Sequence, residues 1–302
     1  MNQIPPGGGI LLLDKPEGPT SHDVVGWVRR ALQERRVGHT GTLDPFASGL
    51  LVLCVGPATR LVPYLVGADK TYDAEARLGV GTDTLDREGA VVSDDEAWAG
   101  LTETTIVSAL ADFRGELQQI PPAFSAKKVG GEAAHRKARR GETVKLDPVP
   151  VTIHEIEALE VELPRVRFRV RVSSGTYVRA LARDLGTALG TAAHLTHLRR
   201  TAVGPWPVGE ALSGDPREGG IPAEAWIAPL DALVDWPHVA LGEEEALRLA
   251  QGQRIRLQGV DDGRVAAHWN GSLLAVCDIV DGVLRPRRVF PPPAPETRLG
   301  TA

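Results

Sequence analysis

The chain has 302 residues, of which 42% are hydrophobic and 24% are charged, as in ordinary globular proteins. This length predicts roughly two domains. A formal net charge of -5 excludes a uniformly basic nucleic-acid-binding protein, although a local cluster of bases can still bind phosphate. Cys54 and Cys277 lie far apart without metal-ligand neighbours, so we expect two buried thiols. With no secretory signal and no long apolar run, we expect a cytoplasmic protein without membrane segments.

The first elements expected along the chain are a buried strand over residues 9–13 and a helix that begins after Thr20. Thr20 and Asp23, three residues later, fit a capping box. Apolar residues then recur at helical spacing, at positions Val24, Val25, Val28 and Leu32. Residues 37–49 are rich in Gly, Thr and Pro without a clear period, which indicates an ordered loop.

Two strands and a short helix are expected after this loop. Residues 50–55 are apolar and predict a strand, and residues 58–66 predict a short helix. Residues 70–79 alternate strictly between apolar and polar side chains, which predicts a half-buried strand. The apolar face of that strand would carry Tyr72, Ala74, Ala76 and Leu78.

The middle of the chain combines exposed segments with one further helix. Residues 83–95 are acidic and are expected to be exposed, and residues 102–113 predict a helix. Residues 120–141 contain paired prolines, paired glycines and many bases. This composition predicts an excursion from the sheet rather than a part of its core.

The last third begins with another alternating strand, over residues 164–172, and a helix over residues 177–189 that Thr176 would cap. Residues 244–250 predict a short helix. Short strands follow with two hairpin signals, at Asn270-Gly271 and Asp281-Gly282.

Together these elements predict an α+β fold, with a mixed, largely antiparallel sheet, flanking helices and a small C-terminal β-barrel. We expect a first domain over residues 1–235, with a basic insertion at about 120–150. A β-rich domain over residues 236–292 would follow. The proline-rich tail over residues 293–302 is expected to be disordered.

Asp44 is the first candidate for chemistry. It precedes Pro45 in a glycine-rich segment over residues 38–45. An Asp before Pro is restricted to extended geometry, and glycines allow sharp turns, so this segment can present a carboxylate from a constrained loop. The alternative is a turn in which Asp44 only caps backbone amides.

Arg179 is the second candidate, because it lies in the first turn of a predicted helix. A cation there faces the positive end of the helix dipole, which is unfavourable unless an anion lies nearby. A guanidinium can pair bidentately with a buried carboxylate such as Asp44. The alternative is an exposed surface arginine.

Tyr72 can either fill the core among small residues or form the floor of a pocket that stacks on a base. His39, His194 and His197 lack a carboxylate or Cys ligand beside them, so we expect no metal. The clustered bases are either solvated charge or a phosphate-binding surface. They are Lys127, Lys128, Arg136, Lys137, Arg139, Arg140, Arg199 and Arg200.

The sequence resembles the TruB-type pseudouridine synthases, which isomerise uridine 55 in the T-loop of tRNA. Five motifs carry the resemblance in the right order, which makes it specific: residues 9–16 with Ser21, residues 38–49, residues 70–84, residues 174–179 and residues 198–200. The C-terminal part is similar to a PUA domain, an RNA-binding β-barrel, through residues 251–255 and the hairpins after them.

The resemblance implies a role for each matched residue. Asp44 would be the nucleophile, Tyr72 would stack on the target base and assist in proton removal, and Arg179 would pair with Asp44. The bases named above would contact the RNA backbone. The side chains that would bind the flipped nucleotide or its loop are His39, Tyr177 and Leu198.

Pseudouridine formation breaks the N1–C1′ bond, turns the base and rejoins it through C5. No electrons are gained overall, so we expect no cofactor, and the sequence lacks a glycine-rich phosphate loop followed by Lys-Ser/Thr. The implied partner is the T-arm of tRNA, with no obligatory protein partner and a monomeric chain. Whether Asp44 attacks C1′ or C6, or first removes a ribose proton, stays open.

The residues leave two alternative functions. A passive RNA-binding or RNA-folding protein would not need Asp44, Tyr72 and Arg179. A guide-RNA-dependent relative, of the kind found in archaeal and eukaryotic ribonucleoproteins, commonly carries long basic tails, which this chain lacks. The sequence therefore favours the stand-alone enzyme.

Overall fold

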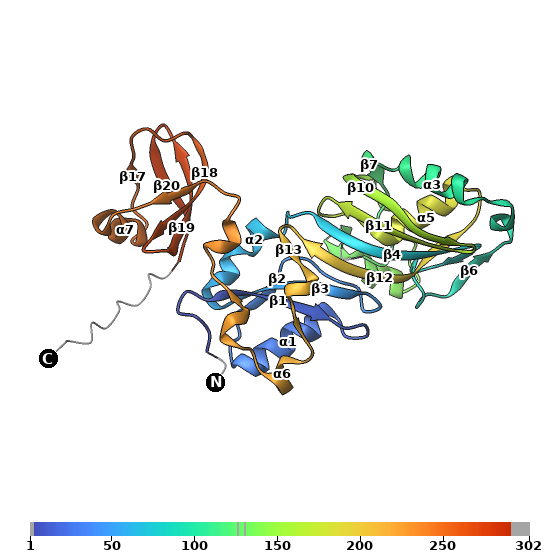
Figure 1. Cartoon of the computed structure of the whole chain (residues 1–302), viewed down its shortest axis with the longest axis horizontal. Helices are drawn as coiled ribbons and strands as arrows, with labels where there is room; N and C mark the ends of the chain where they lie inside the picture. The colour runs from blue at the N-terminus through green and yellow to red at the C-terminus, as the bar shows by residue number, and fades with distance from the viewer. Residues whose placement is uncertain (1–2, 126, 130, 291–302) are drawn as a thin grey trace.

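The computed structural model describes residues 3–125, 127–129 and 131–290. Figure 1 shows an elongated molecule, with a large sheet over most of its length and a smaller sheet at one end. None of the helices in the described part of the chain is long and apolar enough to cross a membrane. The tail expected over residues 293–302 lies outside the described residues.

The large sheet has eleven strands, eight of them in the order β14-β1-β3-β12-β4-β11-β10-β7. In the described chain its strand pairs are antiparallel except β1 with β14 and β3 with β12, so the expected mixed, largely antiparallel sheet is confirmed. The strands are β1 (Gly9–Lys15), β2 (Val37–His39), β3 (Ser48–Val55), β4 (Lys70–Leu78), β7 (Gly115–Gln119), β10 (Val149–Glu162), β11 (Arg165–Val172), β12 (Ala193–Val203), β13 (Trp206–Pro207), β14 (Leu212–Ser213) and β15 (Trp226–Ile227).

Helices cover the apolar faces of this sheet. Helix α1 (Ser21–Leu32) begins with the predicted capping box at Thr20 and packs on β1 and β3. Helices α3 (Glu103–Ala111) and α5 (Val178–Ala188) pack on β4, β10, β11 and β12. The short helix expected over residues 58–66 is a 3-10 turn, η1 (Gly56–Leu61), followed by α2 (Val62–Leu65).

The remaining elements are short. Two small hairpins leave the large sheet, β5 (Val80–Thr82) with β6 (Val91–Asp94) and β8 (Lys128–Val129) with β9 (Glu132–Ala133). The other single turns are α4 (Ala134–Arg139), η2 (Ala97–Gly100), η3 (Val208–Glu210), α6 (Pro216–Gly219), η4 (Ala223–Ala225) and η5 (Asp231–Leu233).

The core follows the alternation read from the sequence. On β4 the predicted apolar face is buried, with Tyr72 8% exposed and Ala76 fully covered. Strand β3 is buried along its whole length because it lies between two clusters, one under α1 and one under α2. The opposite faces of β4, β10 and β11 carry ion pairs between strands, such as Arg169 with Asp73 at 2.7 Å and Arg167 with Glu160 at 2.6 Å.

The C-terminal sheet has the order β16-β18-β19-β20-β17. Both predicted hairpins form, with positive φ at Asn270 and Gly271 and at Asp281 and Gly282, as two-residue type I′ turns require. The sheet curls as half a barrel (Figure 1) and does not close, because β16 and β17 stand at opposite edges. Its elements are β16 (His238–Ala240), α7 (Glu243–Ala250), β17 (Ile255–Arg256), β18 (Gly263–Trp269), β19 (Ser272–Val280) and β20 (Val283–Val289).

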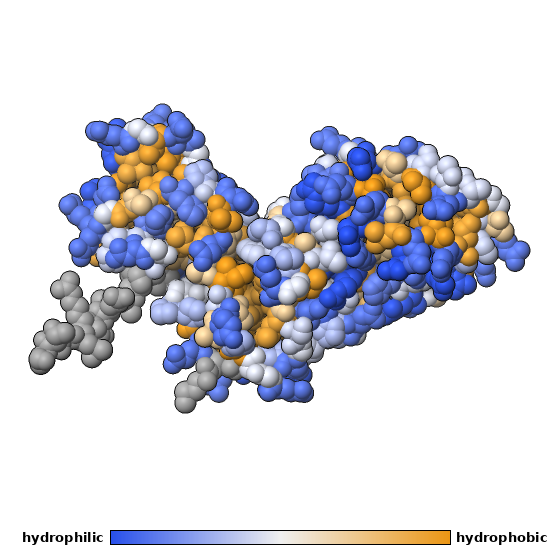
Figure 2. Space-filling view, viewed as in Figure 1, coloured by the Kyte–Doolittle hydropathy of each residue, from blue (hydrophilic) through white to orange (hydrophobic). Residues whose placement is uncertain are grey.

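The two sheets share an apolar junction. Leu230 and Leu233, from the segment before β16, pack in one cluster with Leu273 and Phe290 of the C-terminal part. Figure 2 shows hydrophobic residues gathered where the C-terminal sheet meets the rest of the molecule. Arg60 adds a hydrogen bond from η1 to the carbonyl at the end of β20.

Both cysteines are buried as expected, and burial raises the pKa of each thiol to about 12.

Two local predictions were wrong. Tyr177 is the N-cap of α5 and makes no side-chain cap, while the Thr176 hydroxyl donates to the Ser173 carbonyl at 2.9 Å. The acidic segment over residues 83–95 is not uniformly exposed, because Asp86 is only 5% exposed. The second error arises because a local pattern does not show which side chains the neighbouring elements cover.

Candidate active site

The segment that carries Asp44 joins β2 to β3 and is fixed by buried contacts. Residues 37–49, expected as a loop, begin as β2 and end as the first residues of β3. The Ser21 hydroxyl donates to the Leu43 carbonyl at 3.0 Å and accepts the Leu43 N–H at 2.8 Å. The Asp44 carbonyl accepts the Ala47 N–H at 3.1 Å. The expectation of a constrained loop is therefore confirmed.

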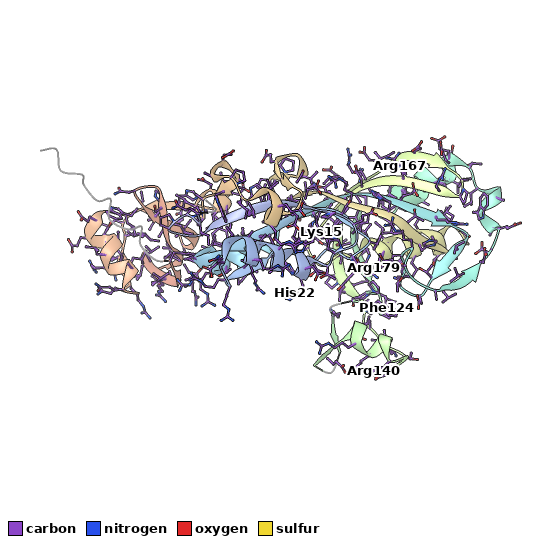
Figure 3. The ribbon with its side chains drawn as sticks, turned by 90° about the horizontal axis from the view of Figure 1, so that it is seen from below. Lys15, His22, Phe124, Arg140, Arg167 and Arg179 are labelled. Atoms are coloured by element: carbon purple, nitrogen blue, oxygen red, sulfur yellow. The ribbon has the colours of Figure 1, made fainter. Side chains whose placement is uncertain are left out.

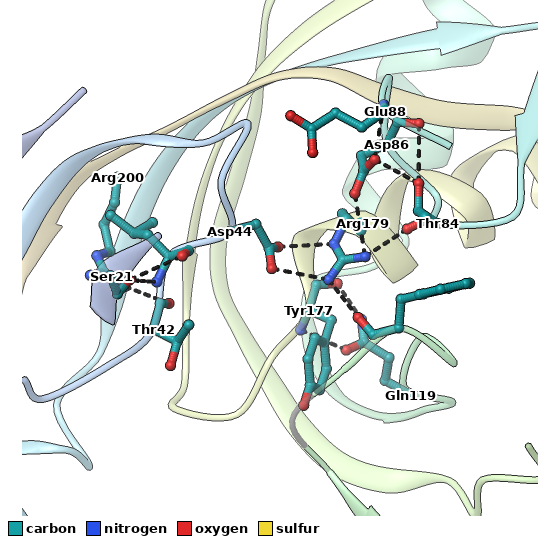
Figure 4. Close-up of polar contacts among 12 residues, drawn as sticks. Ser21, Thr42, Asp44, Thr84, Asp86, Glu88, Gln119, Tyr177, Arg179 and Arg200 are labelled. Carbon is teal, nitrogen blue, oxygen red and sulfur yellow. Dashed lines mark hydrogen bonds and ion pairs between the residues drawn. The ribbon is translucent and has the colours of Figure 1, made fainter. Parts of the chain in front are cut away.

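Arg200 lies under this loop and holds its carbonyl groups (Figure 4). Its Nε donates to the Leu50 carbonyl at 2.6 Å, and its Nη2 donates to the Gly41 carbonyl at 3.0 Å. Gly49 has φ 106°, and a Cβ there would lie 2.2 Å from the Arg200 carbonyl oxygen, so only glycine fits. Our expectation that Arg200 contacts the RNA backbone was wrong, because the side chain is 1% exposed and its donors bind the loop.

Lys15 is a second buried cation near Asp44. Its Nζ donates to the carbonyls of Pro16 at 2.8 Å and Pro19 at 2.9 Å, and to that of Pro45 at 3.4 Å. Burial lowers the pKa of Lys15 to about 8, and the Asp44 carboxylate opposes that fall. The sequence showed Lys15 only as part of a motif, and its contacts give it an anchoring role.

Arg179 is the centre of the site, and each of its N–H groups faces an acceptor (Figure 4). Nε donates to Asp44 Oδ2 at 2.9 Å and Nη2 donates to Asp44 Oδ1 at 3.2 Å, which is the expected bidentate pair. Nη2 also donates to the Phe124 carbonyl at 3.0 Å, and Nη1 donates to the Thr84 carbonyl at 2.6 Å. The expected anion near the start of α5 is thus present.

Asp86 is a second carboxylate on the same guanidinium, and sequence reasoning missed it. Its Oδ2 lies 3.4 Å from Arg179 Nη1, and its side chain is 8% exposed. The Thr84 hydroxyl and the Glu88 N–H both donate to Asp86 Oδ1, at 2.6 Å and 3.1 Å. Asp86 therefore fixes the side of Arg179 that faces away from Asp44. The only signal in the sequence is its place just after the motif over residues 70–84.

The Asp44 carboxylate is the accessible group of this network. Its side chain is 36% exposed, against 5% for Arg179, so the carboxylate is open on one side while its partner is covered. Burial raises the pKa of the Asp44 carboxyl, Arg179 opposes that rise, and Asp86 adds to it. Among the neighbouring groups, Arg179 accordingly favours the ionised form of Asp44 most strongly.

A cavity of about 230 Å³ opens in front of Asp44. Its lining includes Tyr72 and Leu198, which are 8% and 5% exposed, together with Tyr177 and Arg179. Residues from β4, β12 and the start of α5 thus meet the Asp44 loop around one space. The structure brings together the five residues that the sequence assigned to catalysis and to the uridine pocket.

Gln119, which is fully buried, sets the position of Tyr177. The Gln119 side chain accepts the Tyr177 N–H at 2.8 Å and donates to the Tyr177 carbonyl at 3.1 Å. This pair of bonds ties the end of β7 to the start of α5 (Figure 4). No sequence pattern pointed to Gln119, because its partner lies 58 residues away.

His39 stands apart from this cavity lining, at the end of β2. It is half-buried, and its Nδ1 has no hydrogen-bond partner among the described residues. Burial lowers the pKa of His39, and the nearby Arg200 lowers it further. The ring is therefore neutral at pH 7, which suits stacking on a base.

The predicted RNA-binding bases fall into two environments. Figure 3 shows Arg140 on a small lobe that stands away from the body beyond Phe124. This lobe contains β8, β9 and α4. Arg136 on that lobe is exposed, whereas Arg140 forms ion pairs with Glu132 and Glu142, both at 2.7 Å. The side chains of Lys128 and Arg139 lie outside those described.

Arg199 lies on β12, away from the lobe. It donates to both oxygens of Asp14, at 3.0 and 2.7 Å, and its side chain is 34% exposed. The guanidinium is therefore engaged within the protein. Of the bases expected to bind RNA, those with described and unpaired exposed side chains belong to the lobe, namely Lys127 and Arg136.

The fold and the site define an RNA-modifying synthase, and comparison with known proteins gives the family. Residues 29–178 match the N-terminal domain of the TruB family pseudouridylate synthases. Residues 179–213 match the C-terminal domain described for tRNA pseudouridylate synthase B. The chain belongs to the TruB family.

Relatives and solved structures agree with this family. A tRNA pseudouridine synthase B from Arthrobacter sp. (strain FB24) is 44% identical, over 94% of this chain and 97% of the relative. The same-named protein of Burkholderia mallei (strain NCTC 10247) is 44% identical, over 93% and 96%. A chain from an H/ACA RNP bound to a substrate RNA containing 2′-deoxyuridine is 27% identical, with a TM-score of 0.72 over 95% of this chain and 86% of that one.

Proposed function

We propose that this chain converts uridine to pseudouridine at position 55 in the T-loop of tRNA, with Asp44 as the catalytic carboxylate. The observation that carries the proposal is the Asp44–Arg179 pair at the mouth of a cavity that Tyr72 also lines. Membership of the TruB family and the names of the 44% identical relatives support the reaction and the substrate.

The chemistry asks for a reactive group and for a space that keeps the detached base. A carboxylate can act as a covalent nucleophile. Arg179 opposes the rise that burial causes in the pKa of Asp44, and the carboxylate is open on one side. Attack at C1′, attack at C6 and removal of a ribose proton all need that ionised oxygen. Tyr72, Tyr177 and Leu198 line the cavity, so the base can turn without leaving.

The uridine must leave its stack to reach Asp44. Base flipping costs a few kcal/mol, which stacking and backbone contacts repay. Tyr72 would stack on the flipped base, and the neutral ring of His39 would fill the space that opens in the T-loop. The lobe with Lys127, Lys128, Arg136, Lys137 and Arg139 would grip the RNA backbone.

The direct test measures tritium release from 5-labelled uridine in a T-arm hairpin with the purified chain alone. We expect release without any added guide RNA, protein or cofactor, and pseudouridine at the T-loop position. No release from either the hairpin or tRNA would refute the proposal. Release only after addition of a guide RNA would instead assign the chain to the guide-dependent branch.

We further propose that residues 236–292 form a PUA-like RNA-binding domain beside a catalytic domain over residues 1–235. The half-barrel β16–β20 and its own apolar core support this division. We also propose that the chain acts as a monomer, and that it acts in the cytoplasm, where its proposed substrate is found. Sedimentation of the chain with one tRNA would give the stoichiometry.

Asp86→Asn is expected to lower kcat with little change in KM. The variant removes the charge that fixes the far side of Arg179, and a shift of about 1 Å in a catalytic group can cost roughly 10²-fold. Glu88→Gln is the matched control, because Glu88 is exposed and only its backbone contacts Asp86. Equal kcat values for the two variants would remove Asp86 from the network.

Loss of charge on the lobe is expected to weaken RNA binding without changing the chemical step. The double variant Arg136→Gln, Lys137→Gln should reduce the slope of log K against log salt by about two, roughly one per lost phosphate contact. Arg140→Gln should change it less, because Arg140 is paired with Glu132 and Glu142. Binding titrations on the T-arm hairpin over a salt series measure both slopes.

A further inference from the structure

The turn that carries Asp86 has a strained backbone. Asp86 lies between β5 and β6, and the residue before it, Leu85, has φ 63°. This left-handed region is costly for a bulky side chain and persists only where neighbouring contacts hold it. A two-stranded hairpin is itself only marginally stable. The position of Asp86 therefore depends on the contacts that hold the β5–β6 turn against the rest of the molecule.

Arg87 supplies contacts of this kind on the outer side of the turn. Asp86 is buried beside Arg179, whereas the side chain of Arg87 is 40% exposed. Arg87 Nη1 donates to the Thr196 carbonyl on β12 at 3.1 Å, and Nη2 donates to Glu17 Oε2 at 2.5 Å. Two neighbouring residues of one turn thus bind different partners, one inside the active site and one at the surface.

Glu17 joins this arginine to the loop of the catalytic carboxylate. It lies between β1 and α1, next to Gly18, whose N–H donates to the Pro45 carbonyl at 2.8 Å. Glu17 Oε1 also lies 3.3 Å from His197 Nδ1 on β12. The hydrogen bond from Arg87 lowers the pKa of the Glu17 carboxyl, so the pair is ionised at neutral pH. One end of this ion pair is therefore fixed to the backbone of that loop.

A second contact of Arg87 reaches the same loop directly. The guanidinium lies over the ring of Phe46, with Cζ 6.0 Å from the ring centroid, at the outer limit of a cation–π contact. Phe46 is 1% exposed and stands two residues after Asp44. Arg87 therefore reaches the loop both through Glu17 and through Phe46.

Together these contacts form a closed ring around the catalytic carboxylate. On the inner side, Arg179 joins Asp44 to Asp86 (Figure 4). On the outer side, the residue after Asp86 joins the same turn back to the loop. We propose that Arg87 is a positioning residue of the reaction: by closing this ring it keeps Arg179 aligned with Asp44. The inference rests on the proposed function, which assigns catalysis to Asp44.

Binding of an RNA phosphate is the other role open to an exposed arginine beside an active site. Both terminal amino groups of Arg87 already donate to acceptors of the protein, so its geometry favours positioning. The two roles differ in their kinetics. A positioning residue acts on kcat, whereas a contact that is equally strong in the ground state and the transition state acts on KM.

The first test compares Arg87→Gln with the control Arg167→Gln on a T-arm RNA. Arg167 is also exposed and paired with a glutamate, Glu160 at 2.6 Å, but on the outer face of the large sheet. Isolated exposed ion pairs contribute little to stability, so both variants should unfold near the wild-type temperature. We expect kcat for Arg87→Gln to lie about tenfold below that of the control at the same KM, because small displacements of catalytic groups slow a reaction strongly.

A double variant shows whether Arg87 acts through the ring. Asp86→Asn already opens the ring, so the addition of Arg87→Gln should lower kcat by less than about twofold further. Independent, multiplicative effects of the two substitutions would overturn the proposal. A raised KM at unchanged kcat, or a kcat for Arg87→Gln equal to that of the control, would overturn it as well.

Hydrogen exchange over residues 80–94, which contain β5, β6 and their turn, tests the contact without using the reaction. These amides should exchange faster in Arg87→Gln than in the control, and equal exchange would contradict the proposal. A wild-type chain that forms no pseudouridine would refute the proposed function. Exchange would then still decide whether Arg87 holds the β5–β6 turn.

Discussion

Asp44→Asn is expected to abolish pseudouridine formation while tRNA binding stays nearly unchanged. The amide keeps the size of the side chain but lacks the ionised oxygen that all three candidate first steps require. Removal of a catalytic nucleophile costs on the order of 10⁴- to 10⁶-fold in turnover. Binding should persist because the lobe bases and the cavity walls do not depend on that charge.

Single-turnover tritium release and a binding titration on the same tRNA separate the two effects. Asp73→Asn is the matched control, because Asp73 also pairs with an arginine, Arg169 at 2.7 Å, but on the outer side of β4. The control should react at the wild-type rate. Release by Asp44→Asn at a rate near that of the control would show that the reaction does not use this carboxylate.

Arg179→Gln is expected to reduce both stability and activity. The variant leaves Asp44 and Asp86 without their shared cation, and breaking a buried ion pair typically costs about 3–5 kcal/mol. Arg179 holds the pKa of the Asp44 carboxyl down against burial, so its removal raises that pKa. More of Asp44 is then protonated at neutral pH, and turnover should fall by roughly 10³-fold or more.

The pH dependence distinguishes this cause from simple misfolding. Activity requires ionised Asp44, so it is lost as pH falls through the carboxyl pKa. In Arg179→Gln that acid limb should move to higher pH, and part of the activity should return as the pH rises. Arg179→Lys, which keeps a cation but loses the bidentate geometry, should show a smaller shift. An acid limb at the wild-type position in both variants would contradict the pairing.

The sequence predicted the parts of the fold that local patterns determine. The period-two alternation of residues 70–79 and 164–172 identified β4 and β11 together with their buried faces. The capping box at Thr20 and the hairpins at Asn270 and Asp281 formed as expected. Asp44 and Arg179 were predicted to pair, since a motif and an unfavourable helix position both indicated a buried anion.

The contacts that fix the site could not be predicted, because each depends on partners distant in sequence. Asp86 stands in an acidic stretch that resembles a solvated loop. Only the turn between β5 and β6 brings it to Arg179. Arg200 looked like a surface base beside Arg199. Its burial follows from the parallel pairing of β12 with β3, which no local pattern shows.

The buried anchors beneath Asp44 link catalysis to the cooperative unfolding of the whole domain. Lys15, Ser21 and Arg200 reach the loop from β1, α1 and β12, and all three are covered. Opening the loop alone would strip buried cations of their carbonyl partners, which is costly. Hydrogen exchange of the loop amides should then follow global unfolding rather than local fraying. The catalytic geometry consequently persists on heating for as long as the sheet itself remains intact.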